Sequence, residues 1–375
     1  MNVPKGYKMT EVGVIPEDWE VKRIKDIAPL QRGFDLPIST QETGEYPVVY
    51  SNGITSFHNS FTTKGPGVVT GRSGTLGKVH YVESDYWAHN TTLWVTNFLG
   101  NYPLYIYYLY SSLKLERFGS GSGVPTLNRN DVHDYYVAVP PLPEQRSIAR
   151  VLSDTDELIN ALDKLIAKKR DIKKAVMQEL LTGKTRLPGF SGEWEVNTIE
   201  QCADCLDSLR VPLNETNRSK MQGHIPYCGA NGVLDYIDDF IIDDDIILLA
   251  EDGGYFDDYE NRPIAYRIRG KCWVNNHVHI LKAKRDFDQG FLFYSLVHKN
   301  ILAYLATGTR SKLNKKEINK IEIFFPKDKA EQQAIAQILS DIDSEITALE
   351  KRRDKMKAIK QGMMQELLTG RIRLK

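Results

Sequence analysis

A long internal repeat constrains the fold of this chain more than any other feature. Residues 144–187 align without a gap to residues 331–374, which lie 187 positions further on. The heptapeptide MQELLTG at 177–183 recurs unchanged at 364–370. Solenoid repeats span only about 20–45 residues, so a period of this length excludes a solenoid. The chain is therefore predicted to be a tandem duplication of a globular module followed by a long helix.

Apolar residues recur at steps of three and four along both repeated segments, which is the spacing of a coiled-coil seam. The predicted seam of the first copy is Ile148, Val151, Thr155, Leu158, Leu162, Leu165, Lys169, Ile172 and Val176. The second copy is looser, with polar residues at two of its positions: Ile335, Ile338, Ile342, Glu345, Leu349, Arg352, Met356, Ile359 and Met363. About 39 residues at 1.5 Å each predict a rod of roughly 58 Å, and Gly183 and Gly370 are its expected C-terminal caps.

Charge predicts how the two rods pair. Residues 153–163 carry four acids and no Lys or Arg, whereas residues 164–186 carry eight Lys or Arg against two acids. The second copy repeats this order, with acids at 341–350 and nine Lys or Arg against two acids at 351–375. A parallel pair would align like charges, whereas an antiparallel pair lays each acidic half beside a basic half. We therefore expect an antiparallel coiled coil with pseudo-twofold symmetry; a solvated basic face or direct DNA contact is the alternative.

The segments before the rods are predicted to be α+β modules, because short β-like runs are followed by one late helix. The runs lie at 46–50, 67–70, 78–82, 92–95 and 134–139 in the first module, and at 225–228, 245–250, 264–268, 279–281 and 320–325 in the second. The late helices are expected at 103–118 and 289–305. The predicted domains are thus 1–142, a spacer helix at 143–186, a second module at 187–328 and a second spacer helix at 329–375.

Composition excludes several classes of protein. The 375 residues suffice for two or three domains. Lys plus Arg and Asp plus Glu both number 49, so the net charge of zero excludes a histone-like basic binder. No run of 18 apolar residues is present and the first 19 residues lack the apolar core of a secretory signal. We therefore expect a cytoplasmic location.

The four cysteines give little support to a metal centre. Cys202 and Cys205 form a C-x-x-C, but Cys228 and Cys272 lie 44 residues apart rather than as a second close pair. Idle cysteines in a reducing compartment are the favoured interpretation, with a zinc site as the alternative. The pair His277 and His279 could ligate a metal at strand spacing, but alternate residues also share a sheet face, and we favour that structural role.

No motif in the sequence predicts catalysis. The glycine-rich run at 119–123 follows a helix, so it does not join a strand to a helix as a dinucleotide-binding fingerprint does. A G-x-x-x-x-G-K-[ST] motif and the N-P-P-[FYW] or D-P-P-Y motif of amino-methyltransferases are also absent from the sequence. We predict no catalytic residue, no metal and no cofactor in this chain.

A glycine-punctuated loop at 70–78 is the first candidate DNA-binding element. Its polar members are Thr70, Arg72, Ser73, Thr75 and Lys78. Arg can read guanine through two hydrogen bonds, while hydroxyls and backbone amides contact phosphate. A tight hairpin without function is the alternative.

The counterpart of this loop in the second module is acidic, with Glu251, Asp252 and Tyr255 as the candidate residues. Carboxylates can accept a hydrogen bond from cytosine N4 but are otherwise repelled by phosphate. Residues 235–260 hold eleven acids and no Lys or Arg, which is unfavourable for DNA binding unless most face away. The two modules therefore cannot read the same ligand in the same way.

A second candidate surface precedes each rod. Its residues are Asn128 and Arg129 in the first module, and Arg310, Lys312, Asn314 and Lys315 in the second. Basic and polar groups at matching places in both modules are suited to phosphate contact. A solvated turn is the alternative.

The sequence resembles the specificity (S) subunits of type I restriction–modification systems. The resemblance covers nearly the whole chain and is carried by four features. They are the module–rod–module–rod duplication, the Leu-Asn…Pro-Pro-Leu-Pro-Glu-Gln-x-x-Ile-Ala-x-x-Leu run at 127–152 with its echo at 313–339, the repeated MQELLTG, and the Trp-Glu-Val that begins at Trp19 and again at Trp194. One departure is Lys327-Asp328-Lys329-Ala330, where the first copy has Pro-Leu-Pro; the extra residue is expected to alter how the second module meets its rod.

The resemblance implies a function in DNA recognition. Each module would be a target recognition domain that reads one half of an asymmetric, gapped duplex site. The rods would act as a ruler and as the docking surface for two methylation subunits, which bring S-adenosylmethionine and methylate adenine N6. Restriction subunits would bring ATP-driven translocation and cleavage, and Mg and ATP would be bound by the partners. A stand-alone DNA-binding protein and a coiled-coil scaffold without a DNA role are the alternatives.

Overall fold

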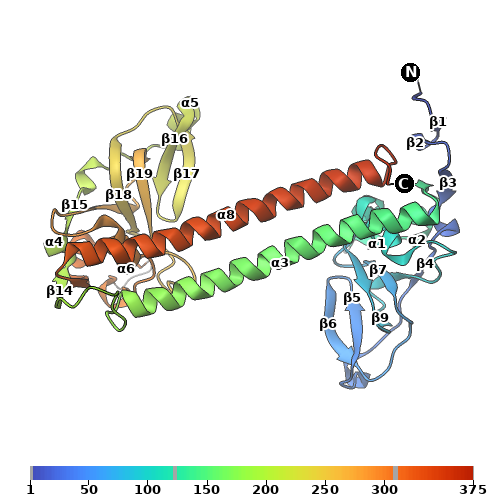
Figure 1. Cartoon of the computed structure of the whole chain (residues 1–375), viewed down its shortest axis with the longest axis horizontal. Helices are drawn as coiled ribbons and strands as arrows, with labels where there is room; N and C mark the ends of the chain where they lie inside the picture. Colours follow the sequence, from blue (N-terminus) through green and yellow to red (C-terminus); the bar gives the residue numbers. More distant parts are fainter. Residues whose placement is uncertain (1–2, 121–124, 307–310, 375) are drawn as a thin grey trace. The chain divides into compact units, whose positions relative to one another are not determined.

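The fold was described from a computed structural model, in which residues 3–120, 125–306 and 311–374 are placed. The chain divides into two compact units. Unit 1 comprises residues 1–163 and 351–375, and unit 2 comprises residues 164–350. Each unit contains one globular module and parts of the two long helices α3 (Leu142–Leu180) and α8 (Lys329–Leu367), as Figure 1 shows. Neither of these helices could cross a membrane, because no described helix is apolar enough over a sufficient length.

The module of unit 1 contains two small sheets whose strands are mostly antiparallel. The first has the order β4 (Leu30–Arg32), β10 (Thr92–Val95), β7 (Gly67–Gly71) and β8 (Val79–Val82). The second has the order β6 (Gly53–His58), β5 (Tyr46–Tyr50) and β9 (Trp87–Ala88). Strand β3 (Glu20–Arg23) pairs with β13 (Tyr136–Val139), and β1 (Tyr7–Thr10) pairs with β2 (Gly13–Pro16).

The module of unit 2 merges the equivalent strands into one six-stranded sheet. Its order is β15 (Ala203–Cys205), β20 (Val278–Ala283), β18 (Ile242–Ala250), β19 (Ala265–Val274), β16 (Gln222–Gly229) and β17 (Gly232–Ile237). The ten-residue strand β19 pairs with both β18 and β16. In unit 1 the corresponding pairings are made by two separate strands, β8 with β7 and β9 with β5, so the sheet there is divided into two. Strand β14 (Trp194–Thr198) pairs with β21 (Glu322–Pro326).

Strand registers confirm the duplication of the modules. In unit 1, Val48 of β5 pairs in parallel with Trp87 of β9, and in unit 2, Tyr227 of β16 pairs in parallel with Trp273 of β19. Each pair is followed by the same kind of hairpin, which turns at Gly53 and at Gly232, both with positive φ. The two modules therefore share one scaffold although few of their residues are identical.

The late helix of each module is shorter than predicted. Helix α1 is Pro103–Ser112, and a 3-10 turn at Leu115–Phe118 follows it, because Lys114 has a φ of 49° and cannot continue the helix. Helix α6 is Gln289–Val297, and a 3-10 turn at Leu302–Tyr304 follows. Tyr105, Tyr108 and Tyr110 of α1 are buried in the core of the module.

The predicted antiparallel pairing of the rods is found inside each unit. In unit 1, Lys360 of α8 pairs with Asp156 of α3 at 2.6 Å, and the hydroxyl of Tyr108 donates to the same carboxylate at 2.8 Å. In unit 2, the equivalent ion pair joins Lys173 to Asp343 at 2.6 Å, and Tyr294 donates to that carboxylate at 2.8 Å. Each acidic half of one helix therefore lies beside a basic half of the other.

The predicted seam of the first rod is wrong at three positions. Leu158, Leu165 and Ile172 are 36%, 39% and 39% exposed. The buried side chains are instead Ile159 and Ile166, which are 7% and 2% exposed and which continue the stripe through Leu162. Both stripes have steps of three and four, so spacing alone does not decide between them; packing against α8 and the module selects the second one.

Candidate nucleic-acid interface

The first candidate loop joins β7 to β8, as predicted. Its sharp path requires glycine at Gly71, because a Cβ there would lie 1.8 Å from the carbonyl oxygen of Thr75. Gly74 and Gly77 have φ values of 83° and 75°, which favour glycine. The glycines thus allow a compact turn whose backbone carries little side-chain bulk.

The polar residues of this loop differ in accessibility. Thr70 is buried at 1% exposure, and its hydroxyl has no hydrogen-bond partner within the described parts of the chain, so its side chain belongs to the module's interior. Arg72 and Ser73 are half-buried, whereas Thr75 and Lys78 are exposed. Lys78 donates to the carbonyl oxygen of Asn52 at 2.8 Å. The Arg72 guanidinium forms no ion pair with any described residue.

The structure brings the two candidate surfaces of unit 1 together. The backbone amide of Leu127 donates to the carbonyl oxygen of Arg72 at 2.8 Å, and Ser73 forms an antiparallel bridge with Thr126. Asn128 follows directly and caps helix α2 (Arg129–His133) by accepting from the amide of Asn130. Arg72 and the exposed Arg129 thus come from one continuous surface rather than from two.

The same backbone contacts recur in unit 2. The amide of Leu313 donates to the carbonyl oxygen of Glu251 at 2.7 Å, and Asp252 forms an antiparallel bridge with Lys312. Glu251 therefore occupies the place that Arg72 has in unit 1, directly after the central strand. Asn314 precedes helix α7 (Lys315–Ile318), just as Asn128 precedes α2. One scaffold presents residues of opposite charge at equivalent positions.

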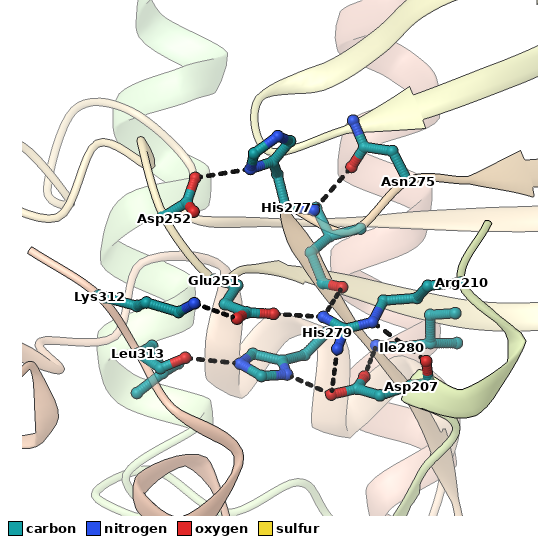
Figure 2. A network of polar contacts seen from close by, with 11 residues as sticks. Asp207, Arg210, Glu251, Asp252, Asn275, His277, His279, Ile280, Lys312 and Leu313 are labelled. Carbon is teal, nitrogen blue, oxygen red and sulfur yellow. Dashed lines mark hydrogen bonds and ion pairs between the residues drawn. The ribbon is translucent and has the colours of Figure 1, made fainter. Parts of the chain in front are cut away.

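A buried polar network neutralises Glu251 (Figure 2). Lys312 pairs with its carboxylate at 3.0 Å, and Arg210 bonds to the other oxygen. Burial alone would raise the pKa of Glu251, but the hydrogen bonds from Lys312 and Arg210 outweigh that effect and hold the pKa below its ordinary value. The Glu251 carboxylate is thus ionised and already paired.

Asp207 and His279 form the floor of the same network. His279 is 1% exposed; its Nδ1 lies 2.7 Å from Asp207 and its Nε2 lies 2.7 Å from the carbonyl oxygen of Leu313. Burial alone would raise the pKa of Asp207. The hydrogen bond and charge of His279 outweigh that effect and hold the pKa below its ordinary value. The network anchors the segment that contains Leu313 to the sheet.

Ion pairs reduce the negative charge of the acidic stretch 235–260, which makes this stretch less unfavourable for DNA binding than its sequence suggests. Several of its carboxylates pair with cations from elsewhere in unit 2: Asp235 with Arg218, Asp244 with Lys282, Asp245 with Arg267, and Glu251 with Arg210 and Lys312. Asp252 also lies 2.9 Å from Nδ1 of His277. The sequence could not show this neutralisation, because the partners are distant in the chain and only the fold brings them close.

Three other candidate residues have distinct environments. Tyr255 is half-buried, with the guanidinium of Arg262 3.1 Å from the centre of its ring. Lys315 and Asn314 are exposed at the start of α7. Arg310 lies outside the described residues.

The cysteines do not converge on one metal site. Cys228 and Cys272 are buried in one core cluster, whereas Cys202 belongs to another. The one described group with metal-ligand spacing is Cys205, Asp207 and His279. Both ring nitrogens of His279 lie 2.7 Å from oxygen atoms, so both are already engaged in hydrogen bonds within the module. These side chains fit a hydrogen-bonded anchor rather than a metal centre.

The junction of each rod with its module repeats as well. Arg373 forms two hydrogen bonds with Glu144, both at 2.7 Å, and Arg186 forms two with Glu331, at 2.6 and 2.7 Å. The copies differ in one contact. Trp19 donates from Nε1 to Glu144 at 2.9 Å, whereas Nε1 of Trp194 has no partner among the described residues. The difference falls beside the predicted departure at 327–330.

Comparison with known proteins agrees with the duplicated scaffold. The family model described as the type I restriction modification DNA specificity domain matches twice, at residues 16–173 and 191–359. A putative type I restriction enzyme specificity subunit of Haemophilus influenzae is 34% identical over 140 residues, which are 37% of this chain and 34% of that protein. The putative MjaX specificity subunit of Methanocaldococcus jannaschii is 26% identical over 99% of this chain and 97% of its own length.

A solved structure has the same fold. The type I restriction–modification S subunit from M. genitalium superposes with a TM-score of 0.72 at 16% identity, covering 98% of both chains. The two family matches together span most of the sequence, and each contains one module with its rod. This chain therefore belongs to the type I restriction–modification DNA specificity family, as a specificity subunit with two recognition domains.

Proposed function

We propose that each unit reads one half of an asymmetric, gapped duplex DNA site, and that the paired helices set the spacing of the two halves. The observation that carries this proposal is the placement of Arg72 and Glu251 at equivalent points of one scaffold. A cation and a paired carboxylate present different groups to base edges, so two such modules suit two unlike half-sites.

We further propose that two methylation subunits and the restriction subunits assemble on this chain. Leu158, Leu165 and Ile172 support a docking role, because they form an apolar stripe on α3 in which each residue is more than a third exposed. S-adenosylmethionine, Mg and ATP would be bound by these partners. The complex would act as an adenine-N6 methyltransferase and a restriction enzyme on cellular and incoming DNA, in the cytoplasm.

In this complex, this chain would recognise the DNA, and the partner subunits would catalyse the reactions. The buried groups Asp207, Glu251 and His279 of unit 2 are engaged with one another, with Arg210 and Lys312 and with backbone groups, so they hold the loop. A stand-alone DNA binder and a scaffold without a DNA role are not favoured, because the family matches cover both modules and both rods.

A map of modified bases in the genome, with and without this gene, tests the proposal. Loss of one gapped N6-methyladenine motif on deletion, with its return on complementation, is the expected result. An unchanged methylation map in a strain that expresses the methylation subunits would contradict it.

A further inference from the structure

Unit 2 contains a hollow that the sequence motifs do not indicate. It has a volume of about 540 Å³ and lies between helix α5 (Glu215–Lys220), the β16–β17 hairpin and the turn before β20. Four asparagines line it, namely Asn214, Asn217, Asn275 and Asn276, together with Arg218, Tyr227 and His277. Its walls are therefore rich in hydrogen-bonding side chains.

Asn275 presents a fixed and unpaired donor to this hollow. The residue is 4% exposed, and its Oδ1 accepts from the amide of His277 at 2.9 Å (Figure 2). Its Nδ2 has no hydrogen-bond partner anywhere in the described chain. Because Asn275 lines the hollow, this donor is available to a ligand that enters it.

Asn276 and His277 add further hydrogen-bonding groups to the lining of the hollow. Asn276 is exposed, and its side-chain amide forms no bond with any residue that the structure describes. Nδ1 of His277 is held by Asp252 at 2.9 Å, which orients the ring and leaves Nε2 for a ligand. The hollow thus adjoins the loop of Glu251 and Asp252 rather than forming a separate site.

The other wall is rigid and basic. Arg218 donates to the carbonyl oxygen of Leu213 at 2.7 Å and lies over the ring of Tyr227, 5.1 Å from its centre. Its partner Asp235 is 3.4 Å away. Side-chain amides can form hydrogen bonds with the edges of bases, and an arginine can lie near the phosphates beside them, so this lining suits DNA.

The equivalent place in unit 1 is closed by its own contacts. The strand registers align Asn90 with Asn276 and His89 with Asn275. The Asn90 amide is bonded to Asp35, and His89 lies 3.0 Å from the hydroxyl of Thr91. Unpaired amides at this position are therefore particular to unit 2.

We propose that this hollow reads base edges in the half-site that belongs to unit 2, with Asn275 and Asn276 as specificity-determining residues. This inference rests on the proposed function. Asn276 offers a donor and an acceptor together, which is the pattern that adenine N7 and N6 require, and the Asn275 donor suits any purine N7, guanine O6 or thymine O4. The readout favours adenine at the base pair that faces Asn276.

The test uses the full complex in cells that express this chain with its methylation subunits. Methylated motifs are mapped for the wild type and for Asn276→Ala, Asn275→Asp and the control Asn261→Ala, which removes an exposed amide from the same unit outside the hollow. For Asn276→Ala we expect one position of one half-site to become degenerate, with discrimination reduced about 5- to 150-fold there. The other half-site, the gap and the control should be unchanged.

Asn275→Asp keeps the oxygen that accepts from His277 but replaces the donor with an acceptor. We expect it to weaken methylation at the same half-site and to alter a base adjacent to the position that Asn276 reads. An unchanged motif in both variants would overturn the inference, and so would an equal loss at both half-sites, which a hollow that docks a partner protein would produce. Failure of the proposed function would be visible separately, as the absence of any gapped motif that depends on the wild-type gene.

Discussion

Arg72 is the residue whose replacement most directly tests base reading by unit 1. Its guanidinium has no ion-pair partner among the described residues, and its carbonyl oxygen is held by Leu127. Arg72→Ala should therefore relax one position of one half-site by about 1–3 kcal/mol, the value of a bidentate contact with guanine, without destabilising the fold. A methylation map measures the change; Arg32→Ala, an exposed arginine in the same module, is the control. Loss of both half-sites would contradict the assignment.

Glu144 carries a pH-dependent part of the stability of unit 1. It is 5% exposed, and although burial alone would raise its pKa, the hydrogen bonds from Arg373 and Trp19 hold the pKa below its ordinary value. Because the folded-state pKa is lowered, this contribution is complete above the unfolded value of about 4.3 and is lost as the pH falls through the folded pKa. Glu144→Gln should destabilise unit 1 by about 3 kcal/mol at neutral pH, because Arg373 loses its buried partner.

Thermal unfolding measured from pH 7 down to pH 3 checks this expectation. The difference between the wild type and Glu144→Gln should shrink in the acid range, as the wild-type carboxylate becomes protonated. A difference that stays constant across this range would show that the charge of Glu144 has no stabilising role.

The contacts and the burial of several site residues could not be predicted from the sequence. The loop at 70–78 and the segment at 126–130 can be recognised from their composition, but the hydrogen bond between Arg72 and Leu127 depends on the folded module. The burial of Thr70 could not be predicted either, because Thr75 and Lys78, which belong to the same polar loop, are exposed. Arg210 was not predicted at all, since its partner Glu251 is 41 residues away and no local pattern connects them.

At the scale of elements, charge predicts more than apolar spacing does. The alternation of acidic and basic halves predicts an antiparallel order of the rods, and the ion pairs Lys360–Asp156 and Lys173–Asp343 agree with it. The predicted seam is wrong at Leu158, Leu165 and Ile172 because α3 has two apolar stripes, and Ile159 and Ile166 of the other stripe are the buried ones. The choice between Leu165 and Ile166 depends on what the helix packs against, which periodicity does not contain.

The neighbouring residues Leu165 and Ile166 provide a matched test of this seam. Ile166→Ala should lower the free energy of unfolding by about 2–5 kcal/mol, because the side chain is 2% exposed. Leu165→Ala should change it by less than about 0.5 kcal/mol, because that side chain is 39% exposed, but it should weaken the binding of partner subunits. Denaturant unfolding and co-purification with the methylation subunits measure the two effects; reversed stability effects would mean that the helix is rotated.

On the scale of the whole molecule, unit 1 is built from both ends of the chain. Leu367, the last residue of α8, and the following Leu368 belong to the core that also contains Trp19 and Ile148. The hydroxyl of Tyr7 donates to the carbonyl oxygen of Gly370 at 3.2 Å, and Arg373 pairs with Asp18 at 2.8 Å as well as with Glu144. Unit 2 has the corresponding contact of Arg186 with Glu331 within one continuous stretch of chain.

Removal of residues 351–375 should therefore damage the first module and spare the second. We expect the amides of β3, β13 and α1 to lose protection against hydrogen exchange, because Leu367, Leu368 and Arg373 no longer cover that core. The amides of β18 and β20 in unit 2 should keep theirs. Equal loss of protection in both units, measured by mass spectrometry, would contradict the division of the chain into these two units.

The closure of unit 1 by residues 351–375 also has a consequence for biosynthesis. Residues 164–350 of unit 2 are translated before residues 351–375, so unit 2 is synthesised in full before the last segment of unit 1. The first module is synthesised earliest, but Glu144 meets Arg373 only after residues 351–375 have been made. The module that is translated first is therefore the one whose core is completed last.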